Sequence, residues 1–150
     1  MFRKLRDKNS LKQMENVEKN VHIYVHSFVK EDKNNGYIAI YWPLKNEVDI
    51  RSLKENIPLA LPRCNDKKEL SFYPWDENPL TKDSEGILSP NNSFSLSHKD
   101  ISIILVPCLS VDKNLIRLGY GGGYFDKLRR DKNWRDVPCI GVLTSNCVST

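Results

Sequence analysis

The sequence predicts an α/β fold with three layers, in which helices flank a mostly parallel sheet. Residues 10–33 carry apolar side chains at helical spacing, whereas residues 101–107 form a nearly continuous apolar, β-branched run. A run of the second kind is typical of a strand buried on both faces of a parallel sheet. Further strands and helices alternate along the chain, as parallel sheets require. The 150 residues can bury one core, so we expect a single domain over residues 1–150.

The individual elements follow from local patterns. Ser10-Leu-Lys-Gln13 resembles a capping box, which predicts a helix of about two dozen residues that ends before Asn34. Asp49 is expected to cap a short helix that runs to Asn56. We expect strands at residues 37–42, 59–62, 101–107 and 137–142, an outlying strand at 69–74, and a helix at about 123–132.

A long stretch at residues 75–99 lacks a regular pattern. It is rich in Pro, Ser, Asn and Asp, which favours an irregular excursion over a helix or strand. Long excursions in compact domains are usually functional, so its length is a hint of function.

The composition is that of a soluble protein. Mean hydropathy is -0.52, and no window approaches the ~20 apolar residues that a membrane span requires. Residues 1–20 are mostly polar and do not resemble a secretory signal, so we expect a cytoplasmic protein without a membrane partner. The net charge is +4, but lysines and acids are interspersed, which argues against nucleic acid and is compatible with a small anionic ligand. The sequence does not define an oligomeric state.

Cysteines and histidines do not form a metal motif. The four cysteines are scattered without Cys-x-x-Cys spacing, so we interpret them as reduced structural thiols. His22 and His26 are four residues apart on the first expected helix, but no third ligand is near them in the sequence. We therefore expect this pair to lie on a surface face of the helix.

The segment from Arg117 to Asp126 concentrates the most chemistry. It holds four glycines, a cation, aromatic rings and a carboxylate within ten residues. Glycines allow close approach of the backbone to a ligand, and free N–H groups can then bind phosphate oxygens. Neither the P-loop nor the Rossmann pattern is present, so a tight strand-to-helix turn without a ligand remains an alternative.

Three stretches together resemble a known family. Residues 105–126 are similar to the signature of 5-formyltetrahydrofolate cyclo-ligase, also called methenyltetrahydrofolate synthetase. Residues 38–49 are similar to the substrate segment of that family, and residues 59–63 to the strand that follows it. The resemblance runs from about Asn20 to Val142, with the motifs in the family's order.

The resemblance implies an ATP-dependent ligase. Its members phosphorylate the formyl oxygen of 5-formyltetrahydrofolate and close the ring to 5,10-methenyltetrahydrofolate, with release of ADP and phosphate. It implies catalytic roles for Arg117 and Tyr120 and a Mg2+ ligand in Asp126. The implied ATP-binding residues are Arg117, Leu118, Gly119, Tyr120, Gly121, Gly122, Gly123, Tyr124 and Phe125.

The family also implies a reduced-folate site. Glu47 matches a glutamate whose carboxylate can accept hydrogen bonds from the pterin N–H groups, and Trp42 would form an aromatic wall. Without the resemblance, Glu47 would be an ordinary exposed acid and Trp42 a core residue. The other implied contacts are Tyr120, Gly121, Gly122, Gly123 and Tyr124, while Arg63 is a weaker candidate for the anionic end of the folate.

The departures from the family pattern leave alternatives open. Cys108, Val111 and Phe125 replace residues that are usually Gly, Phe and Tyr. Two phosphate-binding cations of the family's first helix and a second metal-binding Asp are not matched, so the chain is expected to be shortened at both ends. A catalytically inactive nucleotide- or folate-binding relative, and a non-enzymatic interaction module, are therefore the alternative functions.

Overall fold

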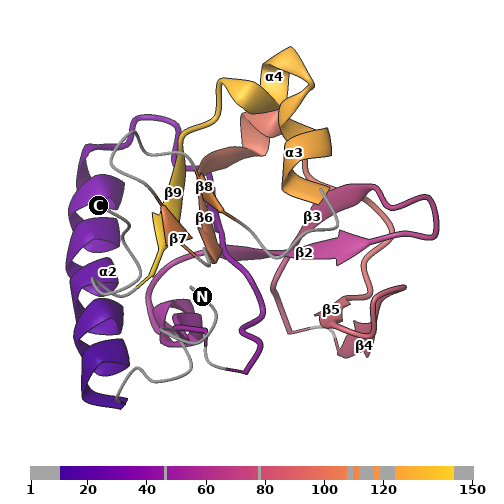
Figure 1. Ribbon diagram of the computed structural model, residues 1–150. Coiled ribbons are helices and arrows are strands. Elements are labelled where there is room, and N and C mark those ends of the chain that lie inside the picture. Colours follow the sequence, from indigo (N-terminus) through magenta and orange to yellow (C-terminus); the bar gives the residue numbers. More distant parts are fainter. Residues whose placement is uncertain are drawn as a thin grey trace.

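The computed structural model describes residues 11–45, 47–77, 79–107, 110–111, 117–118 and 124–143. Its centre is a five-stranded sheet in the order β3-β2-β1-β6-β9 (Figure 1). Only β3 runs antiparallel to its neighbour among these strands, which confirms the mostly parallel sheet. The strands are β1 (Tyr37–Ala39), β2 (Leu59–Cys64), β3 (Leu70–Pro74), β6 (Ile101–Pro107) and β9 (Cys139–Val142).

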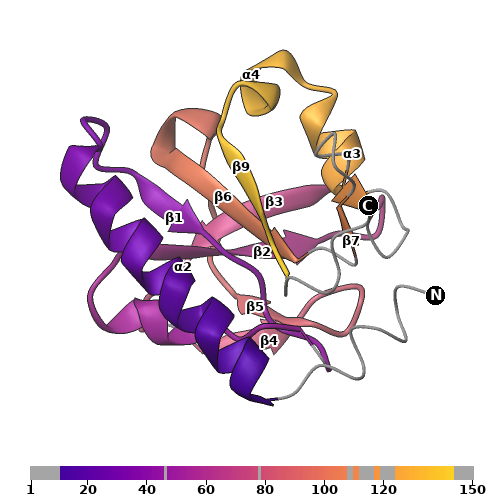
Figure 2. The ribbon, with the colours of Figure 1, turned by 60° about the vertical axis from the view of Figure 1, so that its left-hand side comes forward.

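Helices cover both faces of this sheet, so the expected three layers are confirmed. Helix α2 (Leu11–Glu31) and the 3-10 helix η1 (Arg51–Glu55) contribute to the first core cluster. Helices α3 (Tyr124–Arg129) and α4 (Lys132–Arg135) pack on the second, across the sheet (Figure 2). The described residues contain no helix with both the length and the apolar content needed to cross a membrane.

Strand β6 is apolar at every position except Ser102, and its burial explains this pattern. Ile103 and Leu105 belong to the first core cluster, whereas Ile104 and Val106 belong to the second. Both faces of the strand are buried from Ile101 to Val106, and only Pro107 at its end is partly exposed. The strand expected at residues 101–107 is therefore confirmed with the same bounds.

The entry into β1 depends on close contact with β6. Gly36 donates its backbone N–H to Ser102 Oγ at 2.9 Å. A Cβ atom at Gly36 would lie 2.6 Å from Ser102 Oγ and 2.8 Å from the carbonyl oxygen of Asp100, closer than atoms normally pack. Glycine is required here by space. The strand itself ends at Ala39 rather than at residue 42, although Ile40 still donates to the carbonyl of Ala60 at 2.9 Å.

Residues 75–99 are more regular than the sequence indicated. They contain the antiparallel strands β4 (Leu80–Lys82) and β5 (Leu88–Pro90), joined by a tight turn, and a second 3-10 helix, η2 (His98–Asp100). Arg63 anchors this hairpin to the sheet, because its Nη1 donates to the carbonyls of Pro90 at 2.9 Å and Asn92 at 3.2 Å. The expectation of an irregular excursion was wrong.

The last helix is divided in two. Its expected range of 123–132 contains α3 and the start of α4, and Asp131 caps α4 by accepting a hydrogen bond from the backbone N–H of Asn133 at 2.9 Å. Arg129 donates to the carbonyls of Trp134 at 3.1 Å and Val137 at 2.6 Å. These bonds satisfy carbonyls at a helix end and stabilise the sharp change of direction. Arg129 is therefore a structural residue and not part of a solvated helix face.

We expect the second core cluster to depend on Phe72. Its side chain is 0% exposed, and its ring centroid lies 6.5 Å from that of Phe125 and 5.7 Å from that of Trp134. Because Phe72→Ala would leave a cavity between the sheet and both short helices, we expect a loss of about 3 to 5 kcal/mol in urea unfolding. Phe94 is 86% exposed and provides the matched control, since Phe94→Ala should change stability by about 0.5 kcal/mol or less. Equal effects of the two substitutions would contradict this packing.

Candidate active site

The strand order reverses between β1 and β6. From β1 the chain continues to β2 on one side of the pair, and from β6 the next strand of the sheet is β9 on the other side. In open α/β sheets, ligands bind outside the carboxyl ends of the strands at such a switch point. The residues implied for folate binding follow β1, and the glycine-rich segment follows β6. The topology therefore directs both candidate segments to one edge.

The glycine-rich segment is described only at its ends. The backbone of Arg117 and Leu118 forms β8 (Arg117–Leu118), which pairs antiparallel with β7 (Ser110–Val111). Residues 119–123, with Tyr120 and the four glycines, lie outside the described residues. Tyr124, Phe125 and Asp126 form the first turn of α3, as a strand-to-helix connection requires. The assignments of ATP contacts to this segment therefore stay predictions.

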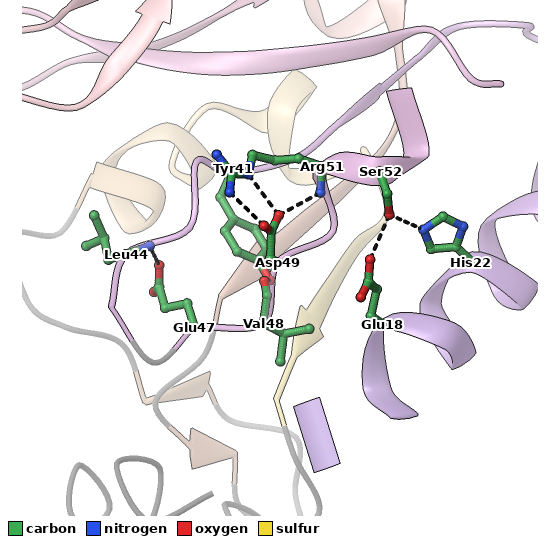
Figure 3. Close-up of polar contacts among 9 residues, drawn as sticks. All are labelled: Glu18, His22, Tyr41, Leu44, Glu47, Val48, Asp49, Arg51 and Ser52. Atoms are coloured by element: carbon green, nitrogen blue, oxygen red, sulfur yellow. Dashed lines mark hydrogen bonds and ion pairs between the residues drawn. The ribbon is translucent and has the colours of Figure 1, made fainter. Parts of the chain in front are cut away.

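Glu47 is buried, unlike most acids. It is 8% exposed, and its Oε1 accepts a hydrogen bond from the backbone N–H of Leu44 at 2.7 Å (Figure 3). The backbone N–H of Glu47 donates in return to the Leu44 carbonyl at 3.0 Å, so the side chain and the main chain close the same turn. Oε2 is also shielded from solvent. The alternative of an ordinary exposed acid is therefore wrong, and a buried carboxylate beside a switch point suits a polar ligand.

Trp42 is partly buried and oriented by charged and aromatic neighbours. The guanidinium carbon of Arg51 lies 4.5 Å from its ring centroid, and the ring of Trp75 meets it edge to face at 5.9 Å. Lys54 Nζ in turn lies 4.4 Å from the Trp75 ring centroid. Cation–π and T-shaped contacts of this kind favour a fixed ring orientation. Trp42 also packs on the first core cluster, as expected of a core residue, and its role as an aromatic wall for the folate stays a prediction.

Asp49 holds Arg51 in place over Trp42. Its Oδ1 accepts from Arg51 Nε at 2.8 Å and from the Arg51 backbone N–H at 3.0 Å, and its Oδ2 accepts from Nη2 at 2.6 Å (Figure 3). The side-chain hydrogen bond from Arg51 lowers the pKa of the Asp49 carboxyl below its ordinary value of 3.8. Asp49 was expected to cap η1, but the cap residue is Ile50. The carboxylate instead forms a fork with the guanidinium.

Helix α2 is joined to η1 by a serine between an acid and a histidine. Ser52 Oγ donates to Glu18 Oε2 at 2.7 Å, and His22 Nε2 lies 2.7 Å from the same Oγ (Figure 3). A nucleophilic triad places histidine between serine and acid, so this order does not activate the serine. The contacts tie α2 to the segment that carries Arg51. The surface position expected for the His22 and His26 pair agrees with this arrangement, and no group of metal-ligating side chains is found within the described residues.

Trp75 is a neighbour of the site that sequence reasoning missed. It contacts Trp42 and lines a groove of about 450 Å³ at the amino ends of β1 and β2. The groove is also lined by Lys54, Asp76 and Glu77. A tryptophan directly after the strand expected at residues 69–74 was the available signal, but it was assigned to the irregular excursion. This groove lies at the edge opposite the switch point.

Within the described residues, Trp42 and Tyr124 do not contact each other. Trp42 packs on the first core cluster, whereas Tyr124 and Phe125 pack on the second, across the sheet. A ligand that touched both would have to pass around the carboxyl edge of β1 and β6. A shared pocket for Trp42 and Tyr124 stays a prediction.

Asp126 is exposed in the first turn of α3. A carboxylate oxygen is a suitable Mg2+ ligand, and Mg2+ on nucleotides usually takes one or two carboxylates together with phosphates and waters. The donor chemistry at Asp126 therefore fits a Mg2+ ion that is bound jointly with a triphosphate.

Two solved structures share this fold. The 5,10-methenyltetrahydrofolate synthetase of Aquifex aeolicus superposes with a TM-score of 0.72 at 25% identity, over 98% of this chain and 76% of the other. The synthetase of Mycoplasma pneumoniae gives a TM-score of 0.70 at 21% identity, over 99% of this chain and 84% of the other. The fold is that of the methenyltetrahydrofolate synthetases, a class of ligase enzymes.

The sequence comparisons identify the family. The model of the 5-formyltetrahydrofolate cyclo-ligase family matches residues 3–146, and the chain therefore belongs to that family. The 5-formyltetrahydrofolate cyclo-ligase of Haemophilus influenzae is 26% identical over 151 residues, which cover 94% of this chain and 79% of the relative. A probable 5-formyltetrahydrofolate cyclo-ligase of Schizosaccharomyces pombe is 31% identical over 101 residues, or 60% of this chain and 50% of the relative. The family predicted from the motifs is confirmed.

We expect Asp49 to stabilise the site in a pH-dependent manner. Because its pKa is lowered by folding, the ion pair contributes stability above the ordinary pKa of 3.8 and loses it as the pH falls through the lowered value. Asp49→Asn should cost about 0.2 to 1 kcal/mol at neutral pH in urea unfolding, since the pair is partly exposed. The difference from the unsubstituted protein should shrink when the measurement is repeated at about pH 2.

The matched control for that measurement is Asp66→Asn. Asp66 is an exposed carboxylate in the turn between β2 and β3. Its substitution should leave stability nearly unchanged at both pH values. A destabilisation by Asp49→Asn that persists or grows in acid would contradict the ion-pair explanation.

Proposed function

We propose that this chain catalyses the ATP-dependent cyclisation of 5-formyltetrahydrofolate to 5,10-methenyltetrahydrofolate, with release of ADP and phosphate. The observation that carries the proposal is the switch point between β1 and β6, because the folate segment follows β1 and the family signature at residues 105–126 starts at the end of β6. Membership of the family supports the reaction. A sheet edge that receives two ligand segments suits a reaction in which one substrate transfers a phosphoryl group to the other.

The proposed reaction begins with a phosphoryl transfer. The formyl oxygen attacks the γ-phosphorus of ATP, the bond to ADP breaks, and the formyl carbon becomes electrophilic. N10 then attacks that carbon and releases its proton, and the C–O bond breaks as phosphate leaves with the former formyl oxygen. The first step needs alignment of the phosphoryl group and neutralisation of its charge more than covalent catalysis by side chains.

In this proposal the nucleotide is bound by the glycine-rich segment. Arg117 supplies a cation for the phosphates, Tyr120 lies at the reacting group, and backbone N–H groups from Gly119 to Phe125 bind phosphate oxygens. Asp126 would hold the Mg2+ ion, which supplies charge neutralisation to the triphosphate. Asp126 is exposed, so its carboxylate is accessible to a metal ion, whereas its place in the first turn of α3 would equally suit a carboxylate favoured by the helix dipole.

The folate is assigned to the segment after β1. Glu47 accepts hydrogen bonds from pterin N–H groups, and its burial supports a strong, oriented interaction because the local dielectric is low. Trp42, held by Arg51 and Trp75, provides the aromatic wall. The proposal also includes a cytoplasmic location, which rests on the sequence pattern, and small-molecule partners only, namely ATP and the reduced folate.

The test is formation of the methenyl product, followed by its absorbance after the protein is mixed with Mg-ATP and 5-formyltetrahydrofolate. Glu47→Gln should lower kcat/KM by roughly 10- to 100-fold, because a charge-assisted hydrogen bond to the pterin is weakened while the contact with Leu44 can persist. Glu55→Gln, an exposed acid in η1, is the control and should retain activity. The proposal fails if the protein forms no product, and the role of Glu47 fails if both variants behave alike.

A further inference from the structure

The turn between β4 and β5 is fixed to the end of β2. Asp83 Oδ2 accepts the backbone N–H of Cys64 at 3.0 Å, and Ser84 Oγ donates to the Cys64 carbonyl at 2.9 Å. Asp83 Oδ1 also accepts the backbone N–H groups of Glu85 at 2.8 Å and Ile87 at 3.1 Å. One carboxylate therefore both closes the turn and docks it on the sheet, so the backbone of Glu85 has a defined position.

Glu85 connects this turn to α3. Its Oε1 accepts a hydrogen bond from the hydroxyl of Tyr124, the first residue of that helix, although the two residues are 39 apart in sequence. Lys127 adds a second tie, because its Nζ donates to the carbonyl of Lys67 in the neighbouring turn at 3.3 Å. In sequence, Tyr124 directly follows the last glycine of the glycine-rich segment. The start of α3 is therefore held from outside, by acidic and backbone groups of two turns.

The electrostatics of the turn agree with this geometry. A tyrosine phenol is protonated at neutral pH, so the Tyr124 hydroxyl can donate its hydrogen bond to Glu85. Burial, followed by the charges of Asp83 and Glu85, raises the pKa of the Cys64 thiol to about 12. The protonated phenol and thiol carry no charge, so the two carboxylates do not repel them and can accept hydrogen bonds.

We propose that Glu85 is a positioning residue for nucleotide binding, which acts by holding Tyr124 and thereby the start of α3. The proposal rests on the proposed function, since it concerns the same nucleotide. Asp126 lies two residues beyond Tyr124, so a fixed Tyr124 also fixes where the carboxylate assigned to Mg2+ enters the site. Small displacements of such groups strongly weaken nucleotide binding and slow phosphoryl transfer. The loss of the hydrogen bond from Tyr124 to Glu85 should therefore have a measurable effect. Glu85 itself contacts neither substrate in this account.

A purely structural role for Glu85 would have different consequences. It would lower stability or affect the KM values of both substrates equally, whereas a residue that holds the start of α3 should affect the KM for Mg-ATP more than the KM for the folate. The folate residues Trp42 and Glu47 belong to a different segment, and Trp42 packs on the opposite face of the sheet from Tyr124. The KM values for Mg-ATP and for 5-formyltetrahydrofolate therefore distinguish a purely structural role of Glu85 from a role in positioning α3.

The experiment is a double-mutant cycle with Glu85→Ala, Tyr124→Phe and the combined variant, in the full chain. Each single substitution should raise the KM for Mg-ATP by about 5- to 10-fold. The KM for 5-formyltetrahydrofolate should change by less, because both substitutions keep an aromatic ring at position 124. The combined variant should be no worse than either single one, because both remove the same hydrogen bond. Glu85→Gln keeps an acceptor oxygen and should restore part of the affinity. Glu15→Ala, an exposed acid on α2, is the control.

Calorimetric binding of Mg-ATP to the same proteins separates this proposal from the reaction. If the unsubstituted protein binds Mg-ATP but forms no product, the proposed function fails, and weaker binding by the Glu85→Ala variant still supports the positioning role of Glu85. Equal ATP affinities in all variants, additive effects, or parallel changes in both KM values would overturn it. Failure of the unsubstituted protein to bind Mg-ATP would overturn both proposals.

Discussion

The parallel pairing of β1 with β6 is the constraint on which the rest of the structure depends. Ile38 and Ala39 of β1 pair with Ile103 and Ile104 of β6, all four side chains are buried, and the close approach at Gly36 leaves no room for a side chain there. The strands to either side extend the sheet away from this pair, which creates the switch point. Two segments distant in sequence consequently leave the sheet at the same edge. The pairing is thus what the proposed site for two substrates depends on.

The segments that leave this edge are ordered by side chains more than by regular secondary structure. After β1, the Tyr41 hydroxyl donates to the Val48 carbonyl at 2.5 Å, Glu47 closes its own turn, and the Asp49–Arg51 fork lies over Trp42. On the other face, Glu85 holds Tyr124 from the β4–β5 turn. Polar contacts of this kind cost side-chain entropy and contribute little net stability, so their presence at one edge is more readily explained by preorganisation of a site.

The sequence predicted what depends on periodicity and missed what depends on tertiary contacts. The apolar run at residues 101–107 identified β6, and helical spacing identified α2, because burial dictates those patterns directly. The β4–β5 hairpin was missed because its strands have three residues each and carry few apolar side chains. The break between α3 and α4 is stabilised by Arg129 and carbonyls up to eight residues away, which no local pattern indicates. The burial of Glu47 could likewise not be predicted from the sequence, because the turn around it determines how much of its side chain is exposed.

The most direct test of the switch-point site is a crystal structure of the protein with 5-formyltetrahydrofolate and a non-hydrolysable ATP analogue with Mg2+. The account predicts both ligands at the carboxyl ends of β1 and β6, with the pterin at Glu47 and the phosphates at the segment that leads into Tyr124. Either ligand in the groove formed by Lys54 and Trp75 at the opposite edge, with the switch point empty, would contradict it.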